Sequence, residues 1–170
     1  PSTAAVNVAG ERLALVITLF TIREEPTTRR SRRGSRKIRR WYSSILQEIG
    51  IPWNCYGRVN HFTENGVQFA QQLANSGCMR IFLGLESMNN DKLEFYNKRA
   101  TSDMNNVAVL CCYNAGIEVA AGWIIGAPDD TFESLQDELE RFLALPLYSL
   151  DVNILSLNPG SVHTKKVFNG

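Results

Sequence analysis

The sequence lacks any apolar run long enough to cross a membrane, and it has almost no net charge. Its nearest candidate, residues 4–20, is interrupted by Asn7, Glu11 and Arg12, whereas a membrane span needs ~18 apolar residues. The stretch also lacks the charged start and the cleavage site of a signal peptide. The formal net charge over 170 residues is +1, which gives no overall attraction to nucleic acid or membrane. We therefore expect a cytoplasmic protein.

Cysteines are few, and their spacing fits neither a disulfide framework nor a zinc site. Cys55 and Cys78 lie in apolar runs, which predicts buried thiols, and Cys111 and Cys112 are adjacent within a predicted helix. No G-x-G-x-x-G or G-x4-G-K-[ST] motif occurs, which argues against a phosphate-binding enzyme. The apolar fraction of 44% and the charged fraction of 21% are ordinary for one globular domain.

Five apolar runs have the length and composition of strands, and helical periodicity separates them. The predicted strands are residues 13–20, 53–60, 79–85, 118–125 and 150–157. The predicted helices are residues 35–49, 64–74, 91–97, 102–115 and 130–145. We expect Ser102 to cap the fourth helix, a capping box at residues 130–133, Val67 to face inward, and a ragged start over residues 1–10. This alternation predicts an α/β fold with parallel strands, either a barrel or an open doubly wound sheet.

Two predicted strands end in glycine followed by polar residues, namely GLES at residues 84–87 and GAPDD at residues 126–130. Functional groups of parallel α/β folds gather at the carboxyl ends of strands. Glu86 can accept hydrogen bonds from an amine or hydroxyl, and glycines let the main chain approach a flat ring. The plainer alternatives are a solvated carboxylate, a turn at Gly126 and a helix cap at Ser87. Arg58, near another strand end, can pair with a ligand acid or form a structural ion pair.

Four segments together resemble the radical S-adenosylmethionine (SAM) superfamily, over roughly residues 41–161. They are GCMRIFLGLES at residues 77–87, the turn at Lys98, GWIIGAPDDT at residues 122–131 and NPGS at residues 158–161. They resemble, in order, the fourth-strand segment, a lysine-containing turn, the fifth-strand G-x-I-x-G motif and the Pro-Gly element after strand six. Their character is that of the cobalamin-binding and methylthiotransferase-like branches.

The resemblance implies a partial (β/α) TIM-like barrel with about five parallel strands, the second to sixth of six, and helices outside. It also implies an enzyme that reductively cleaves SAM to a 5′-deoxyadenosyl radical and acts on a small-molecule substrate. The implied cofactors are SAM, a [4Fe–4S] cluster and, in the cobalamin-dependent branch, cobalamin. The residues implied to contact SAM are Arg58, Glu86, Ser87, Gly122, Ile124 and Gly126.

The sequence departs from this superfamily where the cluster ligands are expected. The family holds the cluster with C-x3-C-x2-C, because soft thiolates suit iron, and that spacing is absent. An acidic pair common after strand two is also absent, since Ile17 and Thr18 precede Phe20. We therefore expect residues 1–170 to form a single domain, the C-terminal portion of a radical SAM core. Its N-terminal cluster-binding segment would be missing through truncation or loss, so this chain alone would be inactive.

A basic run extends from Arg29 to Arg40, with eight basic residues in twelve. It offers an alternative function, a non-enzymatic RNA-associated module. Few aromatic residues interleave with the run, and a solvated helix face with a charged loop would have the same composition. The SAM interpretation is therefore preferred.

Overall fold

The computed structural model describes residues 6–7, 14–17, 48 and 50–156. The predicted helix over residues 35–49, the basic run and the NPGS segment lie outside them, apart from residue 48. The described strands are β1 (Val6–Asn7), β2 (Ala14–Ile17), β3 (Trp53–Gly57), β4 (Cys78–Glu86), β5 (Glu118–Ile125) and β6 (Ser149–Ile154). The described helices are η1 (Val59–Phe62), α2 (Gly66–Asn75), α3 (Asn90–Phe95), α4 (Ser102–Asn114) and α5 (Phe132–Leu143).

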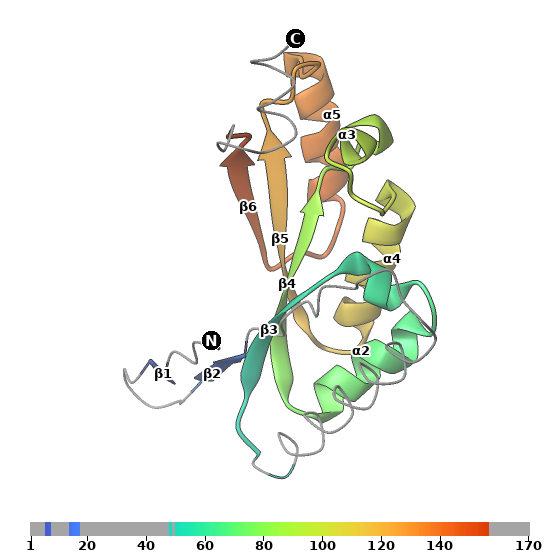
Figure 1. Cartoon of the computed structure of the whole chain (residues 1–170). Helices are drawn as coiled ribbons and strands as arrows, with labels where there is room; N and C mark the ends of the chain where they lie inside the picture. The colour runs from blue at the N-terminus through green and yellow to red at the C-terminus, as the bar shows by residue number, and fades with distance from the viewer. Residues whose placement is uncertain (1–5, 8–13, 18–47, 49, 157–170) are drawn as a thin grey trace, which may run out of the picture.

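The six strands form one sheet in the order β1-β2-β3-β4-β5-β6 (Figure 1). Strands β2 to β6 run parallel to one another, so the prediction of five parallel strands in sequential order is confirmed. The short strand β1 pairs antiparallel with β2, in a stretch for which the sequence predicted only a ragged start.

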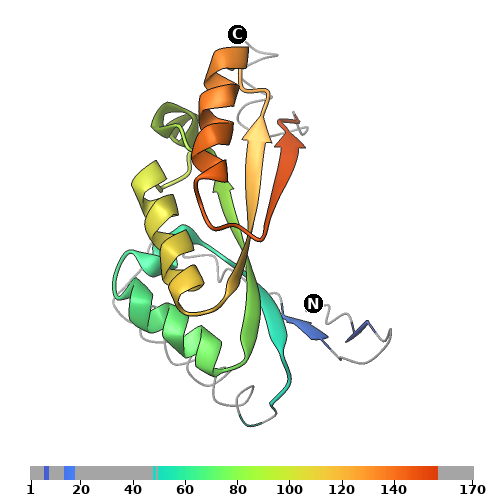
Figure 2. The same cartoon turned by 180° about the vertical axis from the view of Figure 1, so that it is seen from behind.

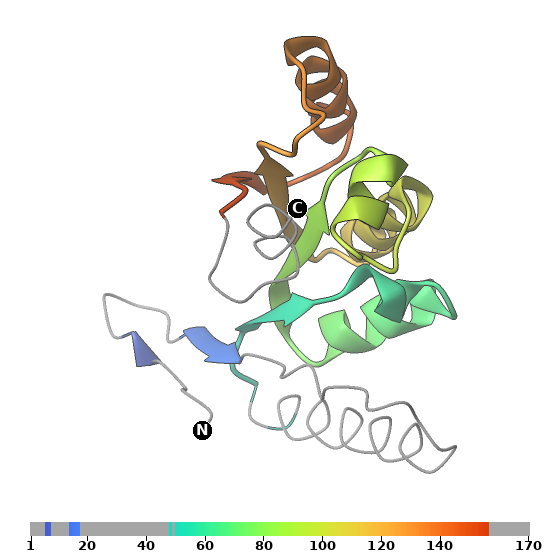
Figure 3. The ribbon, with the colours of Figure 1, turned by 45° about the horizontal axis from the view of Figure 1, so that its top comes forward.

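The described helices α2, α4 and α5 lie along one side of the sheet (Figure 2). Viewed from nearer the strand ends, the strands follow an arc with these helices outside it (Figure 3). We call the opposite side of the sheet the concave face. The arrangement is a partial (β/α) barrel, which decides between the two architectures that strand–helix alternation left open. None of the described helices is long and apolar enough to span a membrane.

The core lies between the sheet and the helices. Ile81, Leu83 and Leu85, at alternate positions of β4, are at most 1% exposed and join one apolar cluster with residues of α2, α4 and β5. Successive side chains of a strand point to opposite faces, so Phe82, Gly84 and Glu86 face the concave side. Cys55 and Cys78 are buried, as the sequence predicted, and Cys111 and Cys112 of α4 are buried as well.

Several element boundaries differ from the prediction for local reasons. Strand β3 ends at Gly57, and a 3-10 helix follows where three more strand residues were expected. Val67 was predicted to face inward but is exposed, since helix α2 presents Gly66, Ala70 and Leu73 to the core. The capping box of α5 joins Thr131 to Ser134, one position later than predicted.

The N-cap of α4 is Thr101, and the prediction of Ser102 was wrong. The Thr101 hydroxyl accepts a hydrogen bond from the Met104 amide at 3.3 Å. We expect Thr101→Ala to lower the free energy of unfolding by about 1 kcal/mol and Ser102→Ala to change it far less. Urea denaturation of both variants measures this difference. Equal losses would show that the cap does not act through the Thr101 hydroxyl.

Candidate functional site

Glu86 ends β4 in a backbone conformation that side chains rarely adopt. Its φ angle is +67°, and the pairing of β4 with β5 slips between Gly84 and Glu86. A left-handed conformation in a non-glycine residue costs about 1–2 kcal/mol, and such strain concentrates at functional sites. The surrounding structure therefore holds Glu86 in place at the carboxyl end of the strand, where the sequence predicted a site.

The Glu86 carboxylate lies back over the sheet and pairs with Lys98. Lys98 Nζ is 2.6 Å from Glu86 Oε1, and both side chains are about one-quarter exposed. Gly84 makes this possible, because a Cβ there would lie 2.5 Å from Glu86 Oε1 and 3.1 Å from Lys98 Nζ. Any larger residue at position 84 would displace the ion pair.

The carboxyl end of β5 lies beside this ion pair. Gly122 pairs in register with Gly84, and a Cβ on Gly122 would lie 4.0 Å from Glu86 Oε2. The half-buried Ile124 follows on the same face, and its carbonyl accepts a hydrogen bond from the Tyr96 hydroxyl at 3.4 Å. Burial, with the nearby carboxylates, raises the Tyr96 pKa to about 12, so this hydroxyl stays protonated at neutral pH. Three of the predicted residues, Glu86, Gly122 and Ile124, thus lie together.

The loop after β5 is organised by Asp130. Asp130 Oδ2 accepts hydrogen bonds from the amides of Gly126 at 2.7 Å and Ala127 at 2.9 Å. Gly126 has a φ angle of +88°, which only glycine adopts without cost. Burial raises the pKa of Asp130, but hydrogen bonds from Lys92 and from the two amides outweigh it and hold this pKa below its usual value. The Gly126 amide is therefore already engaged, while the residue itself is exposed.

Lys92, Glu138 and Asp130 form a buried charged cluster, which we call the buried triad. Lys92 Nζ lies 2.6 Å from Glu138 Oε1 and 2.8 Å from Asp130 Oδ1, and the three side chains are 8%, 1% and 7% exposed. Glu138 Oε2 also accepts hydrogen bonds from the Met88 amide at 2.8 Å and from the Ser87 hydroxyl. The triad thereby joins α3, α5 and the loops that follow β4 and β5.

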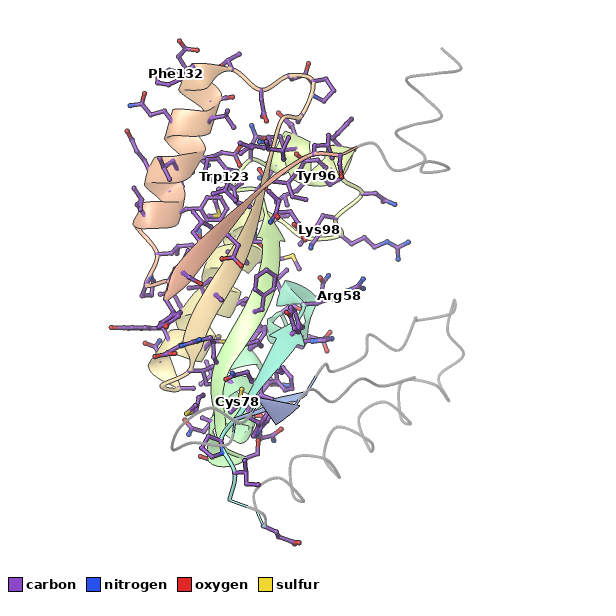
Figure 4. The ribbon with its side chains drawn as sticks, turned by 90° about the vertical axis from the view of Figure 1, so that its left-hand side faces the viewer. Arg58, Cys78, Tyr96, Lys98, Trp123 and Phe132 are labelled. Carbon is purple, nitrogen blue, oxygen red and sulfur yellow. The ribbon has the colours of Figure 1, made fainter. Side chains whose placement is uncertain are left out.

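Ser87 and Arg58 lie apart from the Glu86–Lys98 pair. Ser87 is fully buried, and its hydroxyl donates to Glu138 rather than facing the concave side. Arg58 is exposed, one residue beyond β3, at the N-cap of η1. In Figure 4, Arg58 and Lys98 are labelled toward the β3 edge of the view, whereas Trp123 lies toward α5. Arg58 is thus at the end of β3, the strand next to β4.

Sequence reasoning missed Lys92 and Glu138. The position of Glu138 in the sequence nevertheless indicates that it is buried. Glu138 stands between Leu135 and Phe142 on the inward face of α5. A charged residue within an apolar helical stripe must find a partner, because an unpaired buried charge is very costly. Lys98 was noted in the sequence as part of a turn, but it was not named as a site residue.

The described residues do not fit an iron–sulfur cluster. They contain no group of three or more His, Cys, Asp or Glu residues that could hold a metal ion. Cys55 Sγ and Cys78 Sγ lie 3.8 Å apart in the core, and their hydrogen bond together with burial raises the pKa of Cys55. The Cys55 thiol therefore resists forming the thiolate that iron requires.

A separate hollow of about 590 Å³ lies at the amino ends of β4 and β5, with Arg80 and Glu118 among its lining residues. These two residues form an exposed ion pair, with Arg80 Nη2 2.6 Å from Glu118 Oε2. This is the end of the sheet opposite Glu86, and in βα barrels it is associated with stability rather than function. The candidate site is therefore the carboxyl end of β4 and β5.

Comparison with known proteins found enzymes of related sequence. The chain is 30% identical over 118 residues to an uncharacterised methyltransferase of Pyrococcus horikoshii, covering 69% of this chain and 25% of that protein. It is 29% identical over 113 residues to the bacteriochlorophyllide d C-8(2)-methyltransferase of Chlorobaculum tepidum. This match covers 65% of this chain and 24% of that protein. The chain thus spans about a quarter of the length of these relatives. No protein-family model matches it.

Solved structures with the same fold include two radical SAM enzymes. Coproporphyrinogen III oxidase (HemN) of Escherichia coli superposes with a TM-score of 0.58 at 17% identity, covering 68% of this chain and 26% of that one. The methyltransferase TsrM of Kitasatospora setae, with cobalamin and a [4Fe–4S] cluster bound, superposes with a TM-score of 0.53 at 20% identity. The match covers 61% of this chain and 20% of that one. The resemblance predicted from the sequence is therefore confirmed, for part of a domain.

Proposed function

We infer that this chain, which has the radical SAM fold and is similar in sequence to methyltransferases, binds SAM at the carboxyl ends of β4 and β5. The Glu86–Lys98 ion pair over Gly84 carries this proposal. The amino-acid end of SAM has one ammonium and one carboxylate group. A fixed carboxylate beside a fixed ammonium complements both charges, and hydrogen bonds between ionised groups are the stronger kind.

Neighbouring backbone would hold the adenine and ribose. The Glu86 and Lys98 side chains lie over Gly84, and the Phe82 ring lies over Gly122. The main chain that adenine and ribose would approach is therefore that of Ile124 and Gly126, where glycine allows close contact. Ile124 offers a half-buried apolar side chain on the same face, and the exposed Gly126 follows it. Arg58, from the next strand end, would meet an acidic group of SAM or of the substrate. Ser87 acts through Glu138 as a positioning residue rather than as a contact.

The chemistry of the larger protein is a further proposal. Within that larger protein, residues 1–170 would form the second to sixth strands of the core and would supply contacts to SAM and to the substrate. The reductive cleavage of SAM would require iron ligands from elsewhere, because the described residues do not fit a cluster. Cobalamin is proposed on the likeness to TsrM, whose structure contains it. A small-molecule substrate is proposed on the likeness to TsrM with tryptophan and a SAM analogue bound.

Calorimetric titration of the chain with SAM tests the proposal. Replacing Glu86 by alanine should weaken SAM binding about ten- to a hundredfold, because a hydrogen bond to a charged group contributes ~1.5–3 kcal/mol. Glu94→Ala is the matched control, since Glu94 is an exposed glutamate on the nearby α3. Equal SAM affinity for the wild type and Glu86→Ala, or no saturable binding by the wild type, would contradict the assignment.

A further inference from the structure

The concave face carries an aromatic pair below the proposed SAM site. Tyr56 and Phe82 are register partners on β3 and β4, and their ring centroids lie 5.2 Å apart at 48°. Cys55 and Ile81, their neighbours along each strand, are buried in the core, so by alternation these two rings face the concave side. Tyr56 is nevertheless 51% exposed.

The aromatic surface continues across to β5. Phe82 Cζ lies 3.2 Å from the position that a Cβ on Gly122 would occupy. A side chain at position 122 would therefore push this ring aside, and glycine leaves room for it over β5. Tyr56 and Phe82, whose ring covers Gly122, together offer an aromatic surface that reaches from β3 across β4 to β5.

Strand β6 adds a polar edge to the same face. Its sequence alternates strictly, and Leu150 packs against the core. The intervening residues Asp151 and Asn153 therefore face the concave side, where they are exposed and pair in register with Gly122 and Ile124. From β3 to β6 is three strand spacings, or roughly 14 Å along the sheet.

We propose that the concave face is a substrate site for a flat, conjugated ring system with hydrogen-bond donors along one edge. The ring would stack on Tyr56 and Phe82, as aromatic surfaces prefer, and its donors would reach the Asp151 carboxylate. The inference rests on the proposed function, because the Glu86–Lys98 pair at the strand ends would place SAM next to this ring. An aliphatic ligand would bury apolar surface on these rings but would lack the additional ring–ring interaction.

Riboflavin is a suitable probe, since it is flat, carries an imide N–H on one edge and is fluorescent. We expect saturable quenching on titration with the chain, and an affinity about two- to tenfold lower for Tyr56→Ala. Tyr113→Ala is the matched control, because Tyr113 is 58% exposed on the outward-facing helix α4. Asp151→Ala should weaken binding by a similar factor, whereas the exposed Asp103 on α4 should be replaceable without effect.

The outcomes separate this inference from SAM binding, because the riboflavin titration needs no SAM. Glu86→Ala should leave riboflavin affinity unchanged, and Tyr56→Ala should leave SAM affinity unchanged. Unaltered riboflavin binding by Tyr56→Ala, or an equal loss in Tyr113→Ala, would overturn the inference. Cholate, an amphipathic anion whose saturated ring system is neither flat nor conjugated, should bind at least tenfold more weakly, and equal binding would overturn the claim that the site selects planarity.

Discussion

Replacing Lys92 by methionine is expected to lower the free energy of unfolding by about 3–5 kcal/mol, the usual cost of removing one partner from a buried ion pair. Lys92 is the cation shared by Glu138 and Asp130. Methionine matches its length but leaves two carboxylates facing each other out of contact with water. Part of this cost will appear as a raised pKa of one carboxyl group, which protonates instead of remaining charged.

Urea denaturation at neutral pH measures the effect. Lys98→Met is the matched control, because Lys98 pairs with one carboxylate and is one-quarter exposed; we expect a loss of about 1 kcal/mol or less there. The double variant Lys92→Met with Glu138→Gln should recover part of the stability, because it removes one of the two unpaired charges. A loss below about 1 kcal/mol for Lys92→Met would show that the triad does not stabilise the fold.

Replacing Asp130 by alanine is expected to lower the free energy of unfolding by about 2–3 kcal/mol. Asp130 accepts two backbone hydrogen bonds and pairs with Lys92, and hydrogen bonds to charged groups contribute ~1.5–3 kcal/mol. Asp129→Ala is the control, because the neighbouring Asp129 is exposed and should change stability by less than ~0.5 kcal/mol. Equal losses at the two positions would contradict the assigned contacts.

The same carboxylate predicts a pH dependence. The pKa of Asp130 lies below its ordinary value of 3.8 in the folded protein, so the unfolded chain takes up this proton first as the pH falls. The stabilisation from Asp130 is therefore complete above the unfolded pKa and is lost progressively below about pH 4. Denaturation at a series of pH values should show this acid-side decline, and Asp130→Asn should make it shallower.

Local sequence patterns predicted most of the elements. The strand over residues 118–125 coincides with β5, because a continuous apolar run between two glycines has few alternatives. The predicted ends of elements were wrong where two neighbouring residues could fill the same role. Thr101 and Ser102 both carry a hydroxyl suited to an N-cap, and only the direction of the incoming chain selects Thr101.

The candidate site was predicted in part. Glu86, Gly122 and Ile124 were found because parallel strands bring their carboxyl ends to one edge. Ser87 was placed with them by adjacency alone, yet successive residues at a strand end point in opposite directions. Its hydroxyl therefore meets Glu138, which lies 51 residues away in the chain.

By itself, the sequence determined the order and type of the elements, the parallel sheet and the strand ends that carry polar groups, because these depend on short-range periodicity. Tertiary structure alone decided which charges meet. Lys92 and Glu138 are separated by 46 residues. Glu86 precedes helix α3 in the chain and Lys98 follows it. Both pairs form only when the strands pack. A buried charge has no local pattern that names its partner, since pairing depends on where two distant backbones are held.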